Sequence, residues 1–310
     1  MKPVIIIQGP TAVGKSSLAL ELAEKFNLDI ISADSRQVYK YMDLATAKPT
    51  KTELDAVKHH LIDIITPDEL YNAGRFAREA TEIVDNSDIK FPIICGGTGF
   101  YISSFLEGLC KTPDIEPEVR ALLTEDWDKL GNNIMYQKLV DIDPQVAAKV
   151  SDNDKQRIIR ALEVYFSTHK RLSSYWEEQG LLKPRKVLNI LILDEREDIY
   201  NRINHRYDKM VLSGLLDEIR SLFEMGYKEN SPGLTAVGYK ELIPYILHNH
   251  DLAECINLAK QHSRNYAKRQ LTWYRRNKFN LVFFRKSINY NSVGVHIKEF
   301  IDNYGNIGDY

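Results

Sequence analysis

Residues 4–16 of the chain read VIIIQGPTAVGKS, an apolar run followed by a match to Gly-x-x-x-x-Gly-Lys-[Ser/Thr]. The run predicts a buried strand, and apolar residues at four-residue spacing predict a helix over 15–26. Glycines between a strand and a helix let backbone N–H groups curl around phosphate oxygens, and the helix dipole adds positive potential. The predicted diphosphate-binding residues are Gly9, Pro10, Thr11, Ala12, Val13, Gly14, Lys15 and Ser16. Lys15 supplies a mobile cation, and the Ser16 hydroxyl supplies a ligand for Mg²⁺. The motif as a whole indicates a bound diphosphate or longer phosphate chain and does not specify a nucleotide.

Apolar runs alternate with helical segments along much of the chain. Further strands are expected at 29–33, 60–65, 91–95 and 188–193, and helices at 72–84 and 197–223. Strands that alternate with helices are typical of a parallel sheet with helices on both faces. We therefore expect an α/β fold with a P-loop NTPase-like core.

One stretch departs from this alternation. Strand-like runs disappear, and helical segments follow one another at 116–130, 134–140, 144–150 and 155–168. This pattern predicts a helical insertion over residues 114–180. The catalytic core then consists of residues 1–113 and 181–310, which include a basic C-terminal helix.

Asp34 follows the second expected strand directly. The carboxyl ends of parallel strands line the ligand crevice of an open sheet, so Asp34 is expected beside the phosphate loop. A carboxylate at this position is a candidate general base. Two other interpretations stay open: a turn or helix-capping aspartate, and the aspartate that small-molecule P-loop kinases carry at this position.

Basic residues gather near the C-terminus although the net charge of the chain is only −2. Residues 255–298 contain no Asp or Glu and hold ten basic residues: Lys260, Arg264, Lys268, Arg269, Arg275, Arg276, Lys278, Arg285, Lys286 and Lys298. Lys260, Arg264, Lys268 and Arg276 recur at multiples of four, which predicts a cationic stripe on one helix face. This charge pattern favours a polyanionic partner; a solvated basic helix is the alternative.

The cysteines and the apolar runs exclude several classes of protein. Cys95, Cys110 and Cys255 lie far apart and form no Cys-x-x-Cys pair, so neither a zinc site nor a disulfide framework is expected. No apolar run reaches the length of a membrane span. We expect a cytoplasmic monomer with no membrane partner.

Several motifs beyond the phosphate loop occur in a specific order. They are Asp34–Lys40, Thr46–Pro49, Gly96–Tyr101, Gln156–Val164 and Val237–Lys240. Together with the loop, they resemble the tRNA dimethylallyltransferases, the bacterial tRNA isopentenyltransferase family. The resemblance runs from about Val4 to Arg276.

The resemblance implies a reaction and a set of catalytic residues. The exocyclic amine of the adenine 3′ of the anticodon attacks the first carbon of dimethylallyl pyrophosphate, and pyrophosphate leaves. Asp34 accepts the amine proton, Thr11 lies at the reaction centre, and Arg206 stabilises the leaving group. Mg²⁺ assists near Ser16.

The resemblance also implies contacts to the tRNA anticodon stem-loop. The matching residues are Asp34, Ser35, Arg36, Gln37, Thr98, Arg120, Gln156, Arg157, Ile158, Ile159, Arg160, Thr235, Ala236, Val237, Gly238, Tyr239 and Lys240. The chain departs from the family pattern at two positions. Ala45 stands where relatives carry Gly, so the local turn is expected to differ. Thr235 stands where some relatives carry Arg.

Three alternative functions share part of this pattern. A small-molecule kinase would explain the phosphate loop and Asp34, but neither the acid-free basic segment nor the motif at 156–164. A prenyltransferase for free adenine nucleotide would not need the helical insertion. A non-enzymatic RNA-binding module would be inert toward allylic pyrophosphate.

Overall fold

The computed structural model describes residues 1–310 except 87–90, 111, 114, 180–183 and 305–310. The chain divides into two compact units, Met1–Glu107 with Pro184–Tyr310, and Gly108–Lys183. The helical insertion expected over 114–180 lies within the second unit. In the described part of the chain, no helix combines the length and apolar character needed to cross a membrane.

The first unit is built on a six-stranded parallel sheet of order β3-β2-β4-β1-β5-β6. The strands are β1 Val4–Gln8, β2 Ile30–Ser32, β3 His59–His60, β4 Ile93–Gly96, β5 Val187–Leu193 and β6 Leu281–Phe284. β1 lies between β4 and β5, with Ile7 opposite Cys95 on one side and Ile190 on the other. All five β1 residues are buried and four of them are apolar; the fifth, Gln8, donates from Nε2 to Asn189 Oδ1 on β5 at 2.7 Å. The expected α/β fold is confirmed.

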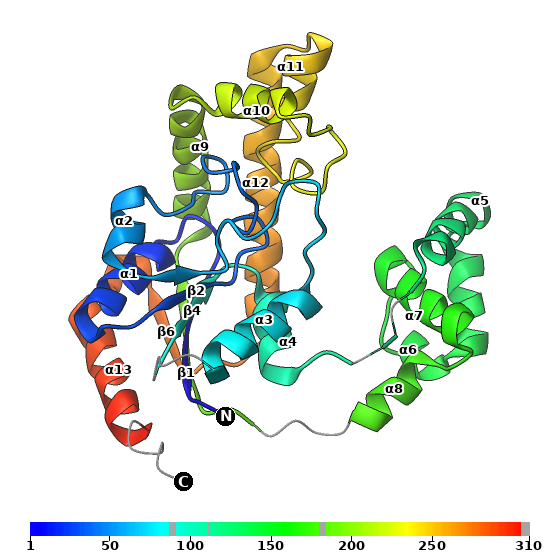
Figure 1. Cartoon of the computed structure of the whole chain (residues 1–310), viewed down its shortest axis with the longest axis horizontal. Helices are drawn as coiled ribbons and strands as arrows, with labels where there is room; N and C mark the ends of the chain where they lie inside the picture. The colour runs from blue at the N-terminus through cyan, green and yellow to red at the C-terminus, as the bar shows by residue number, and fades with distance from the viewer. Residues whose placement is uncertain (87–90, 111, 114, 180–183, 305–310) are drawn as a thin grey trace. The chain divides into compact units, whose positions relative to one another are not determined.

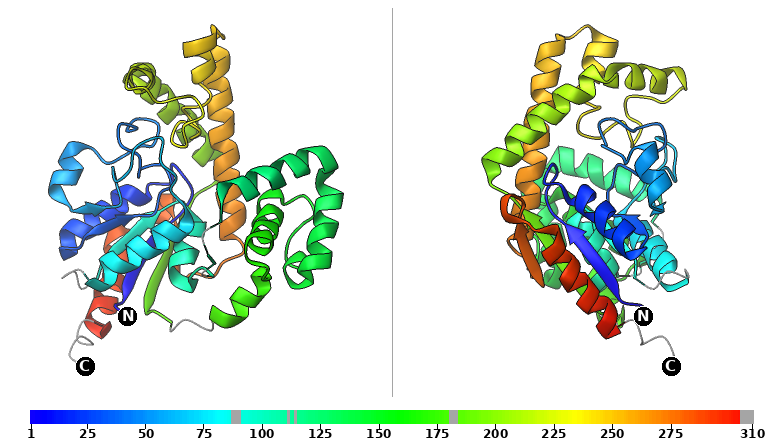
Figure 2. Two further views of the ribbon diagram at one scale, coloured as in Figure 1. Left: turned by 45° about the vertical axis from the view of Figure 1, so that its right-hand side comes forward. Right: turned by 90° about the vertical axis from the view of Figure 1, so that its left-hand side faces the viewer.

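Helices cover both faces of this sheet (Figures 1 and 2). On one face, α1 (Lys15–Phe26) and α13 (Tyr290–Tyr304) pack on Ile5 and Ile7. On the other face, α3 (Ala73–Asn86) and α4 (Gly99–Glu107) enclose Val4 and Ile6. The alternation of β1 side chains between two hydrophobic clusters thus joins the two helical layers.

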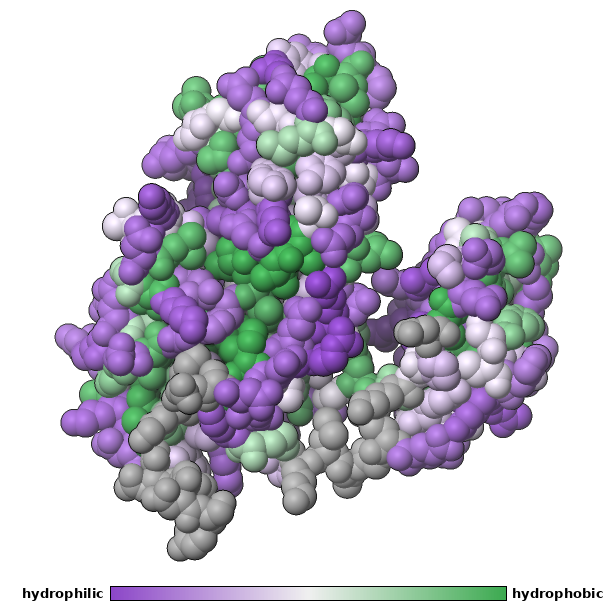
Figure 3. Space-filling view, in the orientation of Figure 1, coloured by the Kyte–Doolittle hydropathy of each residue, from purple (hydrophilic) through white to green (hydrophobic). Residues whose placement is uncertain are grey.

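A further group of helices lies beyond the carboxyl ends of the strands. It consists of α9 (Arg196–Leu212), α10 (Leu215–Glu224), α11 (Ile243–His248) and α12 (Leu252–Tyr274). The short helix α2 (Lys51–Ala56) lies beside α1, and the 3₁₀ helix η1 (Arg285–Ser287) follows β6 directly. α9 and α12 lie side by side. A separate hydrophobic cluster around Tyr239, Leu222 and Leu242 supports this region. In Figure 3, apolar side chains gather in the middle of this unit, whereas most of the remaining surface is hydrophilic.

The helices of the second unit are joined by turns and irregular segments, with no strand among its described residues. Its helices are α5 (Pro117–Ile142), α6 (Pro144–Ala147), α7 (Lys155–Thr168) and α8 (Leu172–Gln179). Leu123, Met135, Leu139 and Leu162 contribute to its core. Non-helical backbone at Gly131 (φ 80°, ψ 170°) divides α5, which separates the two helices expected at 116–130 and 134–140.

Two sequence-based predictions of secondary structure were wrong. The strand expected at 60–65 is only His59–His60, because left-handed backbone at Leu61 and Asp63 turns the chain out of the sheet. The helix expected at 197–223 is two helices, because Gly214 adopts φ 101° between α9 and α10.

Close packing at Gly96 predicts opposite effects for two glycine substitutions. A Cβ on Gly96 would stand 2.1 Å from the Ala33 carbonyl oxygen, so Gly96→Ala should lower the free energy of unfolding by about 1–3 kcal/mol. Gly294 lies inside α13, where a Cβ would meet the flexible end of Lys25 at 3.4 Å and the Phe26 ring at an ordinary contact distance of 3.8 Å. Gly294→Ala should therefore raise stability by about 0.5–1 kcal/mol. Urea unfolding of both variants measures the difference, and equal stabilities would contradict this packing.

Candidate active site

The phosphate loop connects β1 to α1 and is held in a strained, closely packed form. Gly14 has φ 91° and Ala12 has φ 62°, both in the left-handed region. A Cβ on Gly9 would stand 2.3 Å from the carbonyl oxygen of Ile192, so only glycine fits there. This backbone curl is the geometry that turns successive N–H groups toward an anion.

Side chains on one face of α12 form hydrogen bonds with the backbone of the phosphate loop. The Thr11 N–H donates to Gln270 Oε1 at 2.8 Å, and Gln270 Nε2 donates to the Gly97 carbonyl at 2.8 Å. The Tyr274 hydroxyl donates to the Gly9 carbonyl at 3.1 Å. Gln270 therefore ties the loop to the segment after β4.

Two cations converge on the loop within the first unit. The Lys15 ammonium lies 3.3 Å from the Pro10 carbonyl, and Arg206 on α9 donates from Nη2 to Thr11 Oγ1 at 2.7 Å. Burial lowers the pKa of Lys15 and of Arg206, and the nearby Asp34 carboxylate acts in the opposite direction on both. A bound anion would offset the free energy that these two cations lose when they are removed from water, so the site favours a negatively charged ligand.

Arg202 lies one helical turn before Arg206 and contacts the same loop. It donates from Nε to the Ala12 carbonyl at 2.8 Å and pairs with the buried Asp194 at 2.7 Å. The loop backbone is thereby fixed to α9 as well as to α12.

Asp34 lies at the end of β2 with one oxygen engaged and one available. Its Oδ1 accepts from the Arg36 N–H at 2.8 Å and from the Gln37 N–H at 3.4 Å, as in an Asx turn. No described residue donates to Oδ2. The turn interpretation therefore describes Oδ1, while Oδ2 can accept a proton from a substrate.

Thr98 and Tyr266 join Asp34's segment to α12. The Ser35 N–H donates to Thr98 Oγ1 at 3.2 Å, and Tyr266 makes a side-chain hydrogen bond to Thr98. Burial raises the pKa of Tyr266 to about 12, and the negative charge of Asp34 acts in the same direction. Tyr266 and Gln270 were missed from the sequence; with Tyr274 they are four residues apart, a polar repeat on one helix face that could have identified them.

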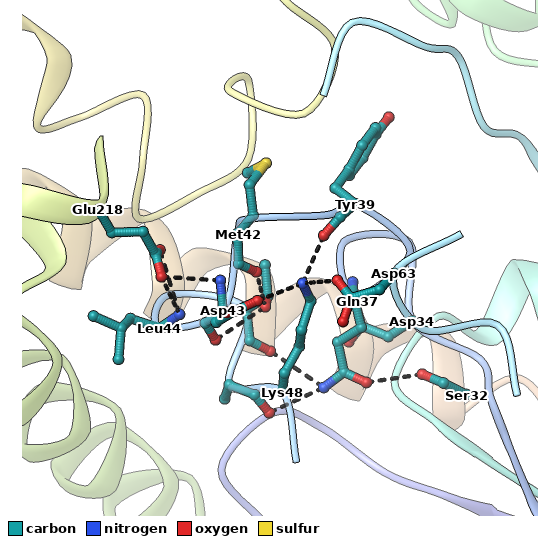
Figure 4. A network of polar contacts seen from close by, with 12 residues as sticks. Ser32, Asp34, Gln37, Tyr39, Met42, Asp43, Leu44, Lys48, Asp63 and Glu218 are labelled. Carbon is teal, nitrogen blue, oxygen red and sulfur yellow. Dashed lines mark hydrogen bonds and ion pairs between the residues drawn. The ribbon is translucent and has the colours of Figure 1, made fainter. Parts of the chain in front are cut away.

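A polar network fixes the segment from Asp34 to Lys48 (Figure 4). Gln37 accepts from Ser32 Oγ at 2.8 Å and donates to the Ala47 carbonyl at 3.0 Å. The Lys48 side chain is 4% exposed; it donates to the Tyr39 carbonyl at 2.6 Å and pairs with Asp43 and Asp63. Tyr41 and Ala47 adopt left-handed backbone in this segment, whereas Ala45 does not, so the expected difference from the turn of relatives at Ala45 stays a prediction.

Residues 235–240 lie beside this segment. Glu218 accepts from the Asp43 and Leu44 N–H groups and from the Tyr239 hydroxyl, which ties the two segments together. Thr235 and Lys240 are exposed, whereas Ala236 and Tyr239 are buried in the hydrophobic cluster. The two buried side chains can therefore contribute to binding only through their backbone or by supporting their neighbours.

The remaining predicted tRNA-contacting residues belong to the second unit. Gln156 and Arg157 are exposed at the start of α7, and Arg160 and Arg120 both contact Glu163. Ile158 and Ile159 are core residues. Considered alone, this unit presents polar and cationic side chains from α5 and α7.

The cationic stripe on α12 is only partly present. Arg276 lies beyond the end of the helix, so the prediction of four cations on one helical face was wrong. Lys260 pairs with Asp208 on α9 at 2.5 Å, and Arg264 donates to Asn204 at 2.6 Å. Lys268 is exposed. α12 thus uses two of these cations to pack against α9.

A phosphate loop with buried cations and a facing carboxylate on a parallel sheet defines an α/β protein of the P-loop class. The model of the IPP transferase family matches residues 37–277. A tRNA dimethylallyltransferase of Carboxydothermus hydrogenoformans is 46% identical over 277 residues, covering 88% of this chain and 89% of the relative. That of Oceanobacillus iheyensis is 44% identical over 285 residues, covering 91% and 90%.

Solved structures are similar over nearly the whole chain. A tRNA isopentenylpyrophosphate transferase of Staphylococcus epidermidis is 38% identical with a TM-score of 0.69, covering 98% of this chain and 99% of its own. A eukaryotic dimethylallyltransferase acting on tRNA is 28% identical with a TM-score of 0.82, covering 98% and 80%. The chain belongs to the IPP transferase family and is an enzyme with transferase function.

Gln270 provides a test of the support beneath the phosphate loop. Gln270→Leu removes one acceptor and one donor that pair with buried backbone groups, so stability should fall by about 1–3 kcal/mol. Because the loop also loses its fixed geometry, the rise in melting temperature caused by pyrophosphate should shrink. Gln261→Leu, an exposed position on the same helix, is the control. An unchanged pyrophosphate effect in Gln270→Leu would show that the loop does not need this support.

Proposed function

We propose that the chain transfers a dimethylallyl group from dimethylallyl pyrophosphate to the exocyclic amine of the adenine 3′ of the anticodon in tRNA. Dimethylallyl transfer to tRNA is the activity of the curated relatives, and neither a kinase nor a prenyltransferase for free nucleotide is favoured. The observation that carries the proposal for this site is the convergence of Lys15, Arg206 and Asp34 on the phosphate loop.

The leaving group is stabilised by the cations. Allylic C–O bonds ionise readily when the departing negative charge is met by preorganised donors. The loop N–H groups and Lys15 would hold pyrophosphate. Arg206 donates to Thr11, the residue proposed to lie beside the reacting carbon of the donor. These charges are already in place before substrate binds.

The attacking amine is a weak nucleophile, because its lone pair is delocalised into the ring. In the proposed step, the C–N bond forms to the first carbon of the donor, the C–O bond to pyrophosphate breaks, and Asp34 Oδ2 accepts the amine proton. Anticodon-loop bases are unpaired, so extruding the adenine costs only about a few kcal/mol or less.

Mg²⁺ fits the donor set next to the loop. Ser16 lines a pocket of about 190 Å³ together with Ser32 and Gln37, and Ser32 Oγ donates to Gln37 Oε1 within it. The hydroxyl oxygens of Ser16 and Ser32 would be the protein ligands. Mg²⁺ commonly takes one or two protein ligands and completes its shell with phosphate oxygens and water. Among the described residues there is no group of three or more His, Cys, Asp or Glu that could hold a metal ion, which suits a cation bound mainly through the substrate. Bound there, it would neutralise charge on the pyrophosphate.

The tRNA would contact both units of the chain. The proposal assigns residues 34–37, Thr98 and 235–240 of the first unit and residues Arg120 and 156–160 of the second to this contact. A monomer acting in the cytoplasm is part of the same proposal, since one chain carries all of these residues and tRNA is a cytoplasmic substrate.

Asp34→Asn tests the proposed base. Asn retains an oxygen that can accept from the Arg36 N–H, so the turn and the binding surfaces should persist. It cannot take up the amine proton, so single-turnover transfer should slow by about 10²–10⁴-fold. Filter binding of tRNA to the same variant should change little. Asp55→Asn in α2, an exposed carboxylate, is the control. Near wild-type transfer by Asp34→Asn would exclude it as the base, and loss of tRNA binding would make it a recognition residue.

A further inference from the structure

Two arginines of the second unit share one buried carboxylate. Glu163 on α7 is 1% exposed. Its Oε1 accepts from Arg160 Nη1 at 2.6 Å, and Arg120 Nε on α5 lies 3.1 Å from its Oε2. Arg160 also donates from Nη2 to Thr112 Oγ1 at 2.5 Å. The arrangement joins two helices and the segment that precedes them.

The two guanidinium groups nevertheless remain accessible to solvent. The side chains of Arg120 and Arg160 are 54% and 41% exposed, while the Glu163 side chain is 2% exposed. Two positive charges and one negative charge leave a net charge of +1 at the surface. Glu163 therefore holds two arginines in place while neutralising only one of their two positive charges.

Glu163 is an unusual residue for the core of a small helical unit. Burying a carboxylate costs free energy, and a well-packed apolar side chain often does as well or better at such a position. Oε2 also has no aligned hydrogen-bond donor among the described residues, so the ion pair with Arg120 does not fully satisfy it. Stability of the unit alone does not account for this cluster.

We infer that Glu163 is a positioning residue that holds Arg120 and Arg160 in one geometry for contact with nucleic-acid phosphate. The inference rests on the proposed tRNA substrate and names the residue that organises that contact. A free arginine loses side-chain entropy when it binds a phosphate. Arginines that Glu163 holds in place lose this side-chain entropy when the chain folds, so the entropy lost when phosphate binds is smaller.

The direction in which tRNA affinity changes in one variant separates this positioning role from simple charge repulsion. Glu163→Gln raises the local charge by one, so a carboxylate that merely repels RNA would, when removed, strengthen tRNA binding. If Glu163 positions the arginines, the same change releases both of them. The tRNA dissociation constant should then rise roughly tenfold, and the salt slope should fall by about 0.7 for each phosphate that the arginines no longer bind.

The experiment uses the full-length chain and tRNA transcript in filter binding across a salt series. The pyrophosphate-induced rise in melting temperature and the KM for dimethylallyl pyrophosphate should not change in Glu163→Gln. The matched control is Asp143→Asn, because Asp143 is 1% exposed in the same unit and its carboxylate accepts from the backbone N–H groups of Val146 and Ser173. An equal loss of tRNA binding in this control would assign the effect to folding of the unit and overturn the inference.

A second variant keeps the test decisive if Glu163→Gln does not fold. Arg160→Lys preserves the charge at an accessible position but cannot span Glu163 and Thr112 with one planar group. It should also weaken tRNA binding. Wild-type binding in Arg160→Lys, or unchanged or tighter binding in Glu163→Gln, would contradict the positioning role. A wild-type chain that binds no tRNA would overturn the proposed function and this inference with it.

Discussion

The burial of Lys15 and Arg206 beside the phosphate loop is the constraint on which the other features of the site depend. Charges removed from water must be held by other groups until an anion arrives. Asp34 supplies an opposite charge from the end of β2, Thr11 accepts from Arg206, and the Pro10 carbonyl lies near Lys15. The parallel sheet, α9 and α12 bring these groups to one edge, because the carboxyl ends of β1, β2 and β4 meet there.

Local sequence signals predicted the elements that are buried and regular. β1 and β5 are apolar except for Gln8 and Asn189, and α1 and α7 have strong helical spacing, so each was located to within a few residues. The errors arose where backbone conformation rather than hydrophobicity decides the outcome. Leu61 and Asp63 lie within the apolar stretch 61–65 but adopt positive φ, and Gly214 separates two helices whose apolar spacing is continuous across it.

The motif residues of the candidate site could be predicted from the sequence, but the residues that hold them in place could not. The phosphate loop, Asp34 and Arg206 were identified from the sequence, and the structure brings them together. Gln270 and Tyr266 were missed because their partners, Thr11, Gly97 and Thr98, lie more than 150 residues away in the chain. The buried carboxylates of Glu163 and Glu218 organise predicted recognition segments in the same way, through contacts that appear only in the folded chain.

The fate of the bound phosphates separates the proposed reaction from that of a kinase: the loop would hold pyrophosphate as a leaving group and would not serve to cleave ATP. The direct measurement is incubation of the wild-type chain with unmodified tRNA, Mg²⁺ and dimethylallyl pyrophosphate labelled in the prenyl group, with ATP in a parallel reaction. We expect label in RNase-sensitive material, one pyrophosphate released per label incorporated, and no turnover of ATP. Steady ATP hydrolysis without transfer of label to tRNA would contradict the proposed reaction.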